Sequence, residues 1–171
     1  PVPNHTYTNA GTYTVTLIAS SSAGCKDTLV LPNNITVNQT PVASFTKSAS
    51  TGCSPLTVNF NNTSTQTNNA TYLWSFGNGT TSTLINPSVQ YTDSGNYTVT
   101  LITTNASGCS DSISQQIHVD LSPTAIASTT DTLGCSSHIA IFNNSSINAT
   151  SYIWNFGDGS TSTTFNPTHT Y

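Results

Sequence analysis

The chain is short of charge of both signs. It has no arginine and no glutamate, and two lysines and six aspartates make up 5% of its 171 residues. With two basic side chains and a formal net charge of -4, it lacks the positive patches that bind nucleic-acid phosphates or anionic lipid headgroups. No apolar run approaches the roughly 20 residues that cross a bilayer as a helix. We therefore expect no nucleic-acid partner and no insertion into a membrane.

Strong helix formers are also scarce. Methionine and glutamate are absent and lysine occurs twice, whereas threonine, valine, isoleucine and tyrosine recur along the chain. The latter residues favour pleated, half-buried strands. Disordered chains lack such regularly spaced aromatic and β-branched residues, so the low charge does not indicate disorder. The composition predicts an all-β protein.

The sequence repeats itself. Residues 71–83, TYLWSFGNGTTST, match residues 151–163, SYIWNFGDGSTST, and the hexapeptide YTVTLI stands at both 13–18 and 97–102. The spacing of 80 to 84 residues is that of one small β-domain.

These repeats predict three domains, of which one is complete. We expect the C-terminal strands of a first repeat in residues 1–40, a complete repeat in 41–121, and the N-terminal part of a third in 122–171. Pro41 and Pro123 stand in the joints, where proline keeps the chain extended.

Apolar residues occupy every second position in three segments of the complete repeat, 56–60, 72–76 and 97–101. A period of two marks strands with one buried face. Gly77 and Gly79 provide the positive φ angles of a sharp turn after the second of these segments. The pattern predicts a sandwich of two antiparallel sheets.

The order of three motifs resembles the PKD domain, an immunoglobulin-like sandwich: Trp-x-Phe-Gly-Asp-Gly, then Asn-Pro-x-His-x-Tyr, then Gly-x-Tyr-x-Val-x-Leu. The third repeat keeps the first two, at residues 154–159 and 166–171. In the complete repeat Asn78 replaces the aspartate and Val89 stands where the histidine would be. The resemblance covers essentially the whole chain. It implies tandem immunoglobulin-like (PKD-type) β-sandwiches arranged head to tail.

Tandem domains of this family serve as spacers, adhesive stalks or accessory modules of extracellular proteins. The resemblance thus implies a structural or adhesive segment of an extracellular fibre or cell-surface stalk, whose partners are adjacent repeats or copies of itself. The alternative is an accessory module of a secreted hydrolase that binds a surface glycan or a protein.

Catalytic patterns are missing from the sequence. It contains no Gly-x-Ser-x-Gly and no paired-carboxylate spacing, so we expect no enzymatic activity. We expect His5 and His169, at matching positions of two repeats, to be packing residues rather than metal ligands. Asp158, at a glycine turn, either stabilises that turn or contributes to a calcium site; we favour the turn and expect no cofactor.

Cysteines recur at two positions: Cys25 and Cys109 begin the last strand, and Cys53 and Cys135 precede the second. A regular pair per domain of this type favours disulfides. In the implied topology the positions lie at opposite ends, because residues 97–104 alone span about 26 Å and a disulfide needs Cα atoms within about 7 Å. We expect the second-strand cysteine of one repeat to bond the last-strand cysteine of the next, with the partners of Cys53 and Cys109 outside this chain.

Several features suit an exposed surface. Thr28, Ser112 and Thr132 each follow an aspartate and precede an apolar residue, which resembles the acceptor motif of a bacterial O-glycosylation system. Chance is the alternative, because two of these motifs are repeat copies. Asn-x-Ser/Thr sequons are also frequent, as an Asn- and Thr-rich composition produces; they include Asn34, Asn69, Asn105 and Asn148.

The third repeat carries two apolar residues on a face that is polar in the complete repeat. Ile139 and Ile141 stand where the complete repeat has Thr57 and Asn59. Two neighbouring exposed isoleucines on one strand indicate a contact surface. We therefore treat the pair as a candidate subunit contact.

Residues 122–171 and 8–38, laid end to end, make one complete domain. Two alternatives follow: the 171 residues are a piece of a much longer array, or each subunit completes the next by lending strands. Both alternatives predict an unbranched polymer of sandwiches.

Overall fold

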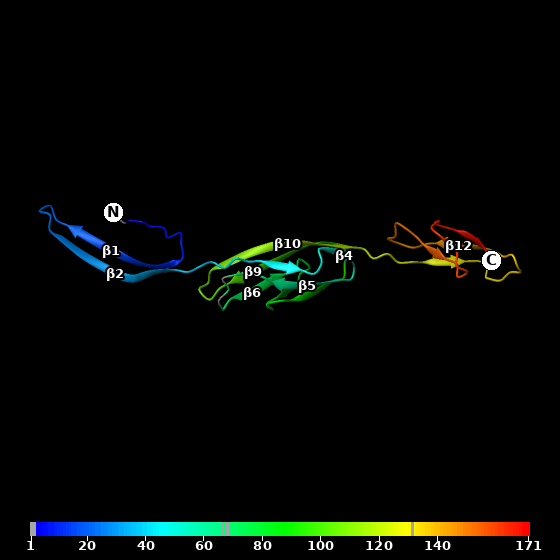
Figure 1. The fold of residues 1–171 in the computed structure, drawn as a ribbon, viewed down its shortest axis with the longest axis horizontal. Helices are drawn as coiled ribbons and strands as arrows, with labels where there is room; N and C mark the ends of the chain where they lie inside the picture. Colours follow the sequence, from blue (N-terminus) through cyan, green and yellow to red (C-terminus); the bar gives the residue numbers. More distant parts are fainter. Residues whose placement is uncertain (1–2, 66, 68, 131) are drawn as a thin grey trace. The chain divides into compact units, whose positions relative to one another are not determined.

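The structure is a computed structural model that describes residues 3–65, 67, 69–130 and 132–171. Every regular element in this part of the chain is a β-strand, which confirms the all-β prediction. The strands form three groups, coloured blue, cyan to green, and yellow to red along the chain in Figure 1. We describe each group by itself and call them the first hairpin, the middle repeat and the third repeat.

The first hairpin pairs β1 (Gly11–Ser20) with β2 (Lys26–Val37). Its register changes at one point, because Tyr13 lies opposite Ile35 whereas Val15 lies opposite Leu31. Residues 32–34 form the resulting bulge, in which Asn33 has a positive φ of 51° and donates its backbone N–H to Thr14 Oγ1 at 3.4 Å. The alternation in the sequence gave no sign of this bulge.

The middle repeat is a closed sandwich of two sheets, with strand orders β3-β5-β8 and β4-β10-β9-β6-β7. Its strands are β3 (Phe45–Lys47), β4 (Thr51–Cys53), β5 (Leu56–Asn62), β6 (Thr71–Ser75), β7 (Thr81–Ser82), β8 (Ser88–Tyr91), β9 (Gly95–Thr104) and β10 (Ser110–Asp120). The predicted alternation is confirmed, because the buried side chains of β5, β6 and β9 stand at every second position.

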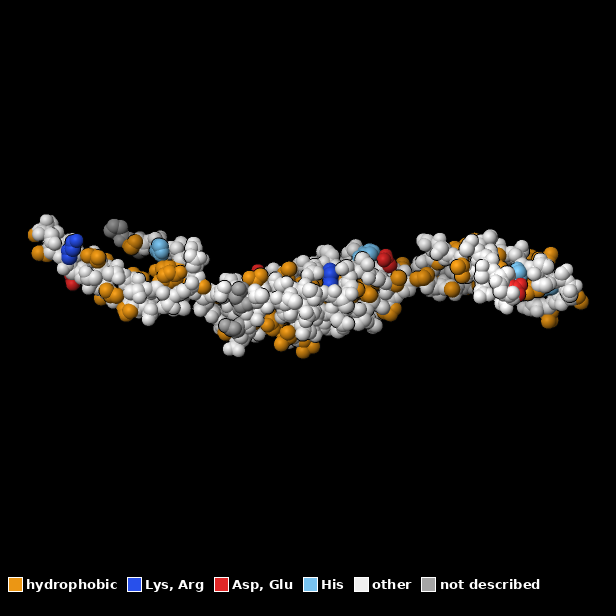
Figure 2. Space-filling view, viewed as in Figure 1, with side chains coloured by type: hydrophobic (Ala, Val, Ile, Leu, Met, Phe, Trp, Pro, Cys, Tyr) orange, Lys and Arg blue, Asp and Glu red, His pale blue; other side chains and the backbone are white. Residues whose placement is uncertain are grey.

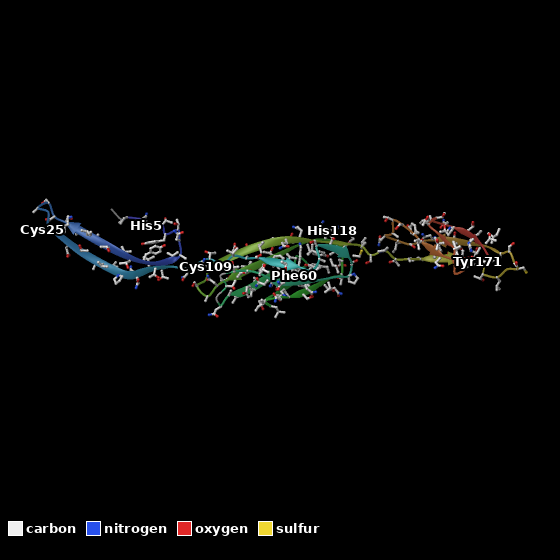
Figure 3. The ribbon with its side chains drawn as sticks, in the orientation of Figure 1. His5, Cys25, Phe60, Cys109, His118 and Tyr171 are labelled. Carbon is white, nitrogen blue, oxygen red and sulfur yellow. The ribbon has the colours of Figure 1, made fainter. Side chains whose placement is uncertain are left out.

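Trp74 occupies the core between the two sheets and is fully buried. Its ring centroid lies 5.1 Å from that of Phe45, 5.5 Å from Phe60 and 6.4 Å from Phe76. Its indole N–H donates to the carbonyl of Leu84 at 2.9 Å, so its one polar group is satisfied. This aromatic cluster, with Phe60 labelled in Figure 3, is the packed centre of the repeat.

The third repeat has two smaller sheets, of strand order β11-β12-β15 and β13-β14. Its strands are β11 (Ala127–Thr129), β12 (Ile139–Asn144), β13 (Trp154–Asn155), β14 (Thr161–Ser162) and β15 (Thr168–Thr170). Trp154 is only half-buried, although Trp74 at the matching position of the middle repeat is fully buried. The third repeat has no counterparts of β9 and β10 among its described strands, and in the middle repeat β9 pairs with the strand of Trp74.

Matching residues differ sharply in burial between the groups. Leu101 is fully buried in the middle repeat, whereas Leu17, in the identical hexapeptide of the first hairpin, is 62% exposed. Tyr91 is 1% exposed, whereas Tyr171 of the third repeat is 49% exposed. Hydrophobic side chains reach the surface of the first hairpin and of the third repeat, and some reach the surface of the middle repeat (Figure 2). Tertiary packing rather than local sequence decides which of these side chains is buried.

Candidate functional site

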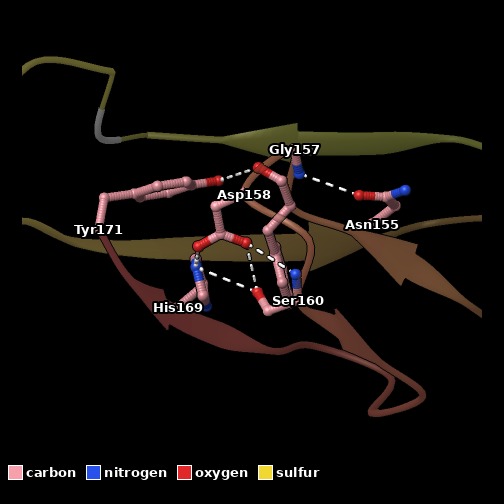
Figure 4. Close-up of polar contacts among 7 residues, drawn as sticks. Asn155, Gly157, Asp158, Ser160, His169 and Tyr171 are labelled. Atoms are coloured by element: carbon pink, nitrogen blue, oxygen red, sulfur yellow. Dashed lines mark hydrogen bonds and ion pairs between the residues drawn. The ribbon is translucent and has the colours of Figure 1, made fainter.

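The glycine turn of the third repeat holds a cluster of polar side chains, Asp158, Ser160 and His169 (Figure 4). Asp158 Oδ1 accepts the backbone N–H of Ser160 at 2.9 Å and its hydroxyl at 2.6 Å. Asp158 Oδ2 lies 2.7 Å from His169 Nε2. The carboxylate thus closes the turn that follows β13 and ties it to β15.

Aromatic packing fixes the position of His169. Its ring stacks parallel on Phe156, with centroids 4.2 Å apart, and meets Tyr171 edge to face at 4.6 Å. The Tyr171 hydroxyl donates to the Phe156 carbonyl at 3.0 Å. These contacts give His169 the packing role beside the turn that we expected.

The cluster contains serine, histidine and aspartate but has the wrong geometry for nucleophilic catalysis. In a catalytic triad the histidine receives the serine proton at one ring nitrogen and is held by the carboxylate at the other. Here Nε2 of His169 faces both partners, at 2.7 Å from Asp158 and 3.4 Å from Ser160. The Ser160 hydroxyl is itself bonded to the carboxylate, so the arrangement stabilises a turn.

The middle repeat builds the same turn without charge. Asn78 Oδ1 accepts the backbone N–H of Thr80 at 3.1 Å and its hydroxyl at 2.6 Å. Val89 stands at the histidine position. The side-chain oxygen alone is therefore enough to close the turn, and the aspartate–histidine pair is present in the third repeat but not in the middle repeat.

The hydrogen bonds from Ser160 and the contact with His169 hold the pKa of Asp158 below its ordinary value of 3.8. A carboxyl whose pKa is lower in the folded state contributes stability above its unfolded pKa and loses it as the pH falls through the folded pKa. We expect the Asp158→Asn variant to lose this part of the acid dependence below about pH 4. Urea unfolding between pH 5 and pH 2 measures the difference.

The matched control for this prediction is Asn78→Asp in the middle repeat. It adds the carboxylate without a histidine partner, so it should add less acid dependence than Asp158 confers. Equal acid dependence of Asp158→Asn and the wild type would show that the Asp158 hydrogen bonds do not favour the ionised form.

Each cysteine of the middle repeat lies at a different end of β10. Cys109 directly precedes β10 and its carbonyl accepts the N–H of Asn105 at 3.0 Å (labelled in Figure 3). Cys53 ends β4, next to Ser54, whose N–H donates to the carbonyl of Asp120 at 2.8 Å. Ten residues of strand separate these ends, about 33 Å. No disulfide joins any of the four cysteines among the described residues, and the predicted pairing with cysteines of neighbouring repeats stays a prediction.

The three candidate glycosylation positions, Thr28, Ser112 and Thr132, are exposed. The aspartates before two of them have local roles. Asp27 accepts the N–H of Thr28 at 2.9 Å, and Asp111 accepts the N–H of Ala43 at 2.8 Å, which fastens the start of the repeat to β10. The aspartate before Thr132, Asp131, lies outside the described residues. These hydrogen bonds give Asp27 and Asp111 structural roles that do not depend on glycosylation. Glycosylation at the three positions stays a prediction.

The remaining candidates are placed as follows. Ile139 and Ile141 are 59% and 44% exposed on β12, so they are available for contact, which stays a prediction.

His5 meets Tyr7 edge to face at 4.7 Å, as His169 meets Tyr171. Within the described part of the chain, no three His, Cys, Asp or Glu side chains gather as a metal site would require. That part also holds no helix long and apolar enough to cross a membrane.

A family model decides the relationship of these repeats. The model of the PKD domain matches residues 38–121 and 122–171. The chain belongs to the PKD domain family. The two matched segments follow one another, so its PKD repeats are in tandem, and the suspected family is confirmed.

The relatives of this PKD chain include a protease. It is 44% identical over 87 residues to the pre-pro-metalloprotease PrtV of Vibrio cholerae, a match that covers 50% of this chain and 9% of the relative. Two solved structures are similar. The PKD1 domain of that metalloprotease is 42% identical and covers 48% of this chain and 99% of its own, with a TM-score of 0.42. The PKD1 domain of Vibrio anguillarum Epp is 33% identical and covers 50% and 100%, with a TM-score of 0.44.

Proposed function

We propose that the chain is a structural or adhesive segment of an extracellular fibre or cell-surface stalk, built from PKD repeats in series. The observation that carries this proposal is where the chain enters and leaves the middle repeat. Asn105, at one end of β10, donates its side-chain N–H to the carbonyl of Gln39 at 2.7 Å. Asp120, at the other end, accepts the N–H of Ser54. A repeat entered at one end and left at the other suits extension in a line.

The interior of the middle repeat suits a mechanical role. Val99 and Leu101 of β9 and Ile117 and Val119 of β10 are all buried to within 1%. Burial of these strands, together with the N–H···O ladder, opposes their separation. Because unfolding under force depends on the barrier to opening, a closed core of this kind favours resistance to extension.

Inter-repeat disulfides would make each joint covalent. In this proposal the second-strand cysteine of one repeat, which is Cys53 or Cys135 in this chain, forms a disulfide with the last-strand cysteine of the next repeat. Cys25 and Cys109 are the last-strand cysteines of this chain. Each bond forms when two thiols give up two protons and two electrons to a disulfide oxidant such as oxidised glutathione. Such bonds persist in oxidising compartments outside the cytosol. The positions of Cys53 and Cys109 at opposite ends of β10 support this pairing.

Peptide mapping of the native protein without reduction tests the proposal. We expect second-strand cysteines linked to last-strand cysteines of a neighbouring repeat. A Cys53–Cys109 link within one repeat would overturn the pairing. Four free thiols in freshly isolated, alkylated protein would contradict both the clamp and the oxidising location.

A second candidate function is favoured by the 44% identity to part of a metalloprotease precursor: an accessory module of a secreted hydrolase that binds glycan or protein. Glycan-binding sites usually offer aromatic faces for stacking, but each of the seven aromatic side chains of residues 41–121 is buried or half-buried. Titration of the chain with oligosaccharides from surface polysaccharides distinguishes the fibre or stalk segment from the accessory binding module. Saturable binding that a Tyr97→Ala or Tyr72→Ala change abolishes would favour the module.

A further inference from the structure

The turn between β6 and β7 of the middle repeat carries the one Asn-Gly pair of the sequence, Asn78-Gly79. Both residues are exposed. Asn78 Oδ1 accepts the backbone N–H and the hydroxyl of Thr80, at 3.1 and 2.6 Å. These bonds fold the side chain back along its own backbone, so its amide carbon stays close to the intervening peptide nitrogen, that of Gly79. The backbone nitrogen of Gly79 is therefore placed to attack the side-chain amide of Asn78.

The surroundings of Gly79 leave room for this attack. A Cβ built at Gly79 meets nothing within 4 Å, and a glycine has no side chain to shield its own nitrogen. Gly77, in the same turn, is packed differently, because a Cβ built there lies 2.8 Å from backbone atoms of Thr98 in β9. Ring closure between Asn78 and Gly79 thus takes place on the open side of the turn, away from the strand that packs on Gly77.

Two other asparagines of the middle repeat are less suited to the same reaction. Asn86 precedes Pro87, whose nitrogen carries no hydrogen and cannot become the nucleophile. Asn105 precedes an alanine, and both ends of its side-chain amide are bonded. Its N–H donates to the carbonyl of Gln39 at 2.7 Å, and its oxygen accepts the backbone N–H of Cys109 at 3.1 Å. Asn78 is therefore distinguished by its neighbour and by its open turn.

We propose that Asn78 is a site of spontaneous deamidation in the folded chain, with water as the only co-reactant. The nitrogen of Gly79 attacks the side-chain carbon of Asn78 and forms a new carbon–nitrogen bond. The bond from that carbon to the side-chain nitrogen breaks, and the proton of Gly79 passes through water to the ammonia that leaves. The two donors of Thr80 stabilise the negative charge that develops on Oδ1 during the attack. Water then opens the five-membered succinimide ring and leaves aspartate or isoaspartate in the chain.

The third repeat shows that aspartate fits this turn. Residues 158–160 stand where the middle repeat has 78–80, and Asp158 Oδ1 accepts the N–H and the hydroxyl of Ser160 at 2.9 and 2.6 Å (Figure 4). An ordinary aspartate at position 78 thus keeps both bonds of the turn. Isoaspartate adds a carbon to the main chain and displaces the side-chain oxygen. We expect a larger share of ordinary aspartate from the folded chain than from a short peptide of the same sequence.

Deamidation changes the charge of the middle repeat. It adds one negative charge to a chain whose formal net charge is -4, at an exposed turn. Val89 stands at the histidine position, so the new carboxylate has no counterpart of the His169 contact. The product should therefore behave like the Asn78→Asp variant, which serves as its standard. This inference goes beyond the fibre role and holds whether or not the chain is part of a fibre.

Incubation of the folded chain at mildly alkaline pH tests the proposal. Anion-exchange chromatography separates the product from the starting chain, with Asn78→Asp as the marker, and peptide mass spectrometry locates the change. We expect Asn78 to convert before any other asparagine of the chain, at a rate within about tenfold of that of a peptide of residues 76–81. A folded chain in which Asn78 stays intact, or in which another asparagine converts first, would overturn the proposal.

Two variants test the route and the turn. Gly79→Ala places a side chain beside the attacking nitrogen and should slow the conversion at least about tenfold. Hydroxylamine, which cleaves succinimides, should cut the wild type after Asn78 and spare Gly79→Ala. Asp158→Asn creates a second Asn-Gly pair in the matching turn and should regain the wild-type mass at a rate similar to that of Asn78. Equal conversion in Gly79→Ala and the wild type, or an inert Asp158→Asn, would contradict the mechanism.

Discussion

Replacing Leu101 by alanine is expected to lower the free energy of unfolding of the middle repeat by about 2 to 5 kcal/mol, the range for truncating a buried leucine. Leu101 is fully buried and lies directly opposite Trp74. The truncation leaves a void between β9 and the aromatic cluster, whose members Phe60 and Phe76 pack within 5.5 Å of one another. Urea unfolding followed by the fluorescence of Trp74 measures the loss, in a Trp154→Phe background that leaves one tryptophan.

The first hairpin supplies the matched control, because Leu17 stands in the identical hexapeptide. Leu17 is 62% exposed, and Leu17→Ala should change the stability of the middle repeat by less than about 0.5 kcal/mol. Equal losses from the two variants would mean that local sequence rather than burial sets the stability of this strand, contrary to our description of the core.

Replacing Gly77 by alanine is the second change with a large expected effect. Gly77 has a φ of 79°, which costs an L-residue about 1 to 2 kcal/mol. The added Cβ would also lie 2.8 Å from backbone atoms of Thr98, and making room for it costs about 1 to 3 kcal/mol more. We expect a total loss of about 2 to 5 kcal/mol, the sum of these two ranges. Chemical denaturation of the middle repeat measures it.

Alanine substitutions at two other glycines separate the cost of the left-handed backbone from the cost of the contact with Thr98. Gly79 has a φ of 85° and open space around its Cβ position, so Gly79→Ala should cost only the conformational part, about 1 to 2 kcal/mol. Gly157→Ala should behave like Gly79→Ala, because nothing lies within 4 Å of a Cβ built at Gly157. A Gly77→Ala variant no less stable than Gly79→Ala would argue against the close approach of β9 to this turn.

Periodicity made the strands of the middle repeat predictable. The alternation of 56–60 and 72–76 depends on residues next to one another in sequence, and both segments bury the side chains expected. The paired glycines of the repeated motif also located the turn, and the resemblance to the PKD domain implied the packing of His169 beside it. The alternation depends on residues close together in the sequence. The turn occurs in two repeats with nearly the same residues, so the structure of one repeat predicts that of the other.

Features that join distant segments were not predictable in the same way. The bond from Ala43 to Asp111 links residues 68 positions apart, and no pattern near either residue announces it. The bulge at 32–34 depends on how β1 aligns with β2. The half-burial of Trp154 depends on strands that pack against it rather than on its own motif, which is the same as that of Trp74. Register and burial are properties of the whole sandwich, whereas the sequence pattern describes one strand at a time.

The measurement that tests the central claim most directly is immunogold electron microscopy of intact source cells with an antibody against residues 41–121. A structural PKD segment of a fibre or stalk predicts gold particles along thin projections outside the cell, spaced as successive repeats would be. Gold confined to the cell interior, or found only on a soluble hydrolase with no projections, would contradict the account.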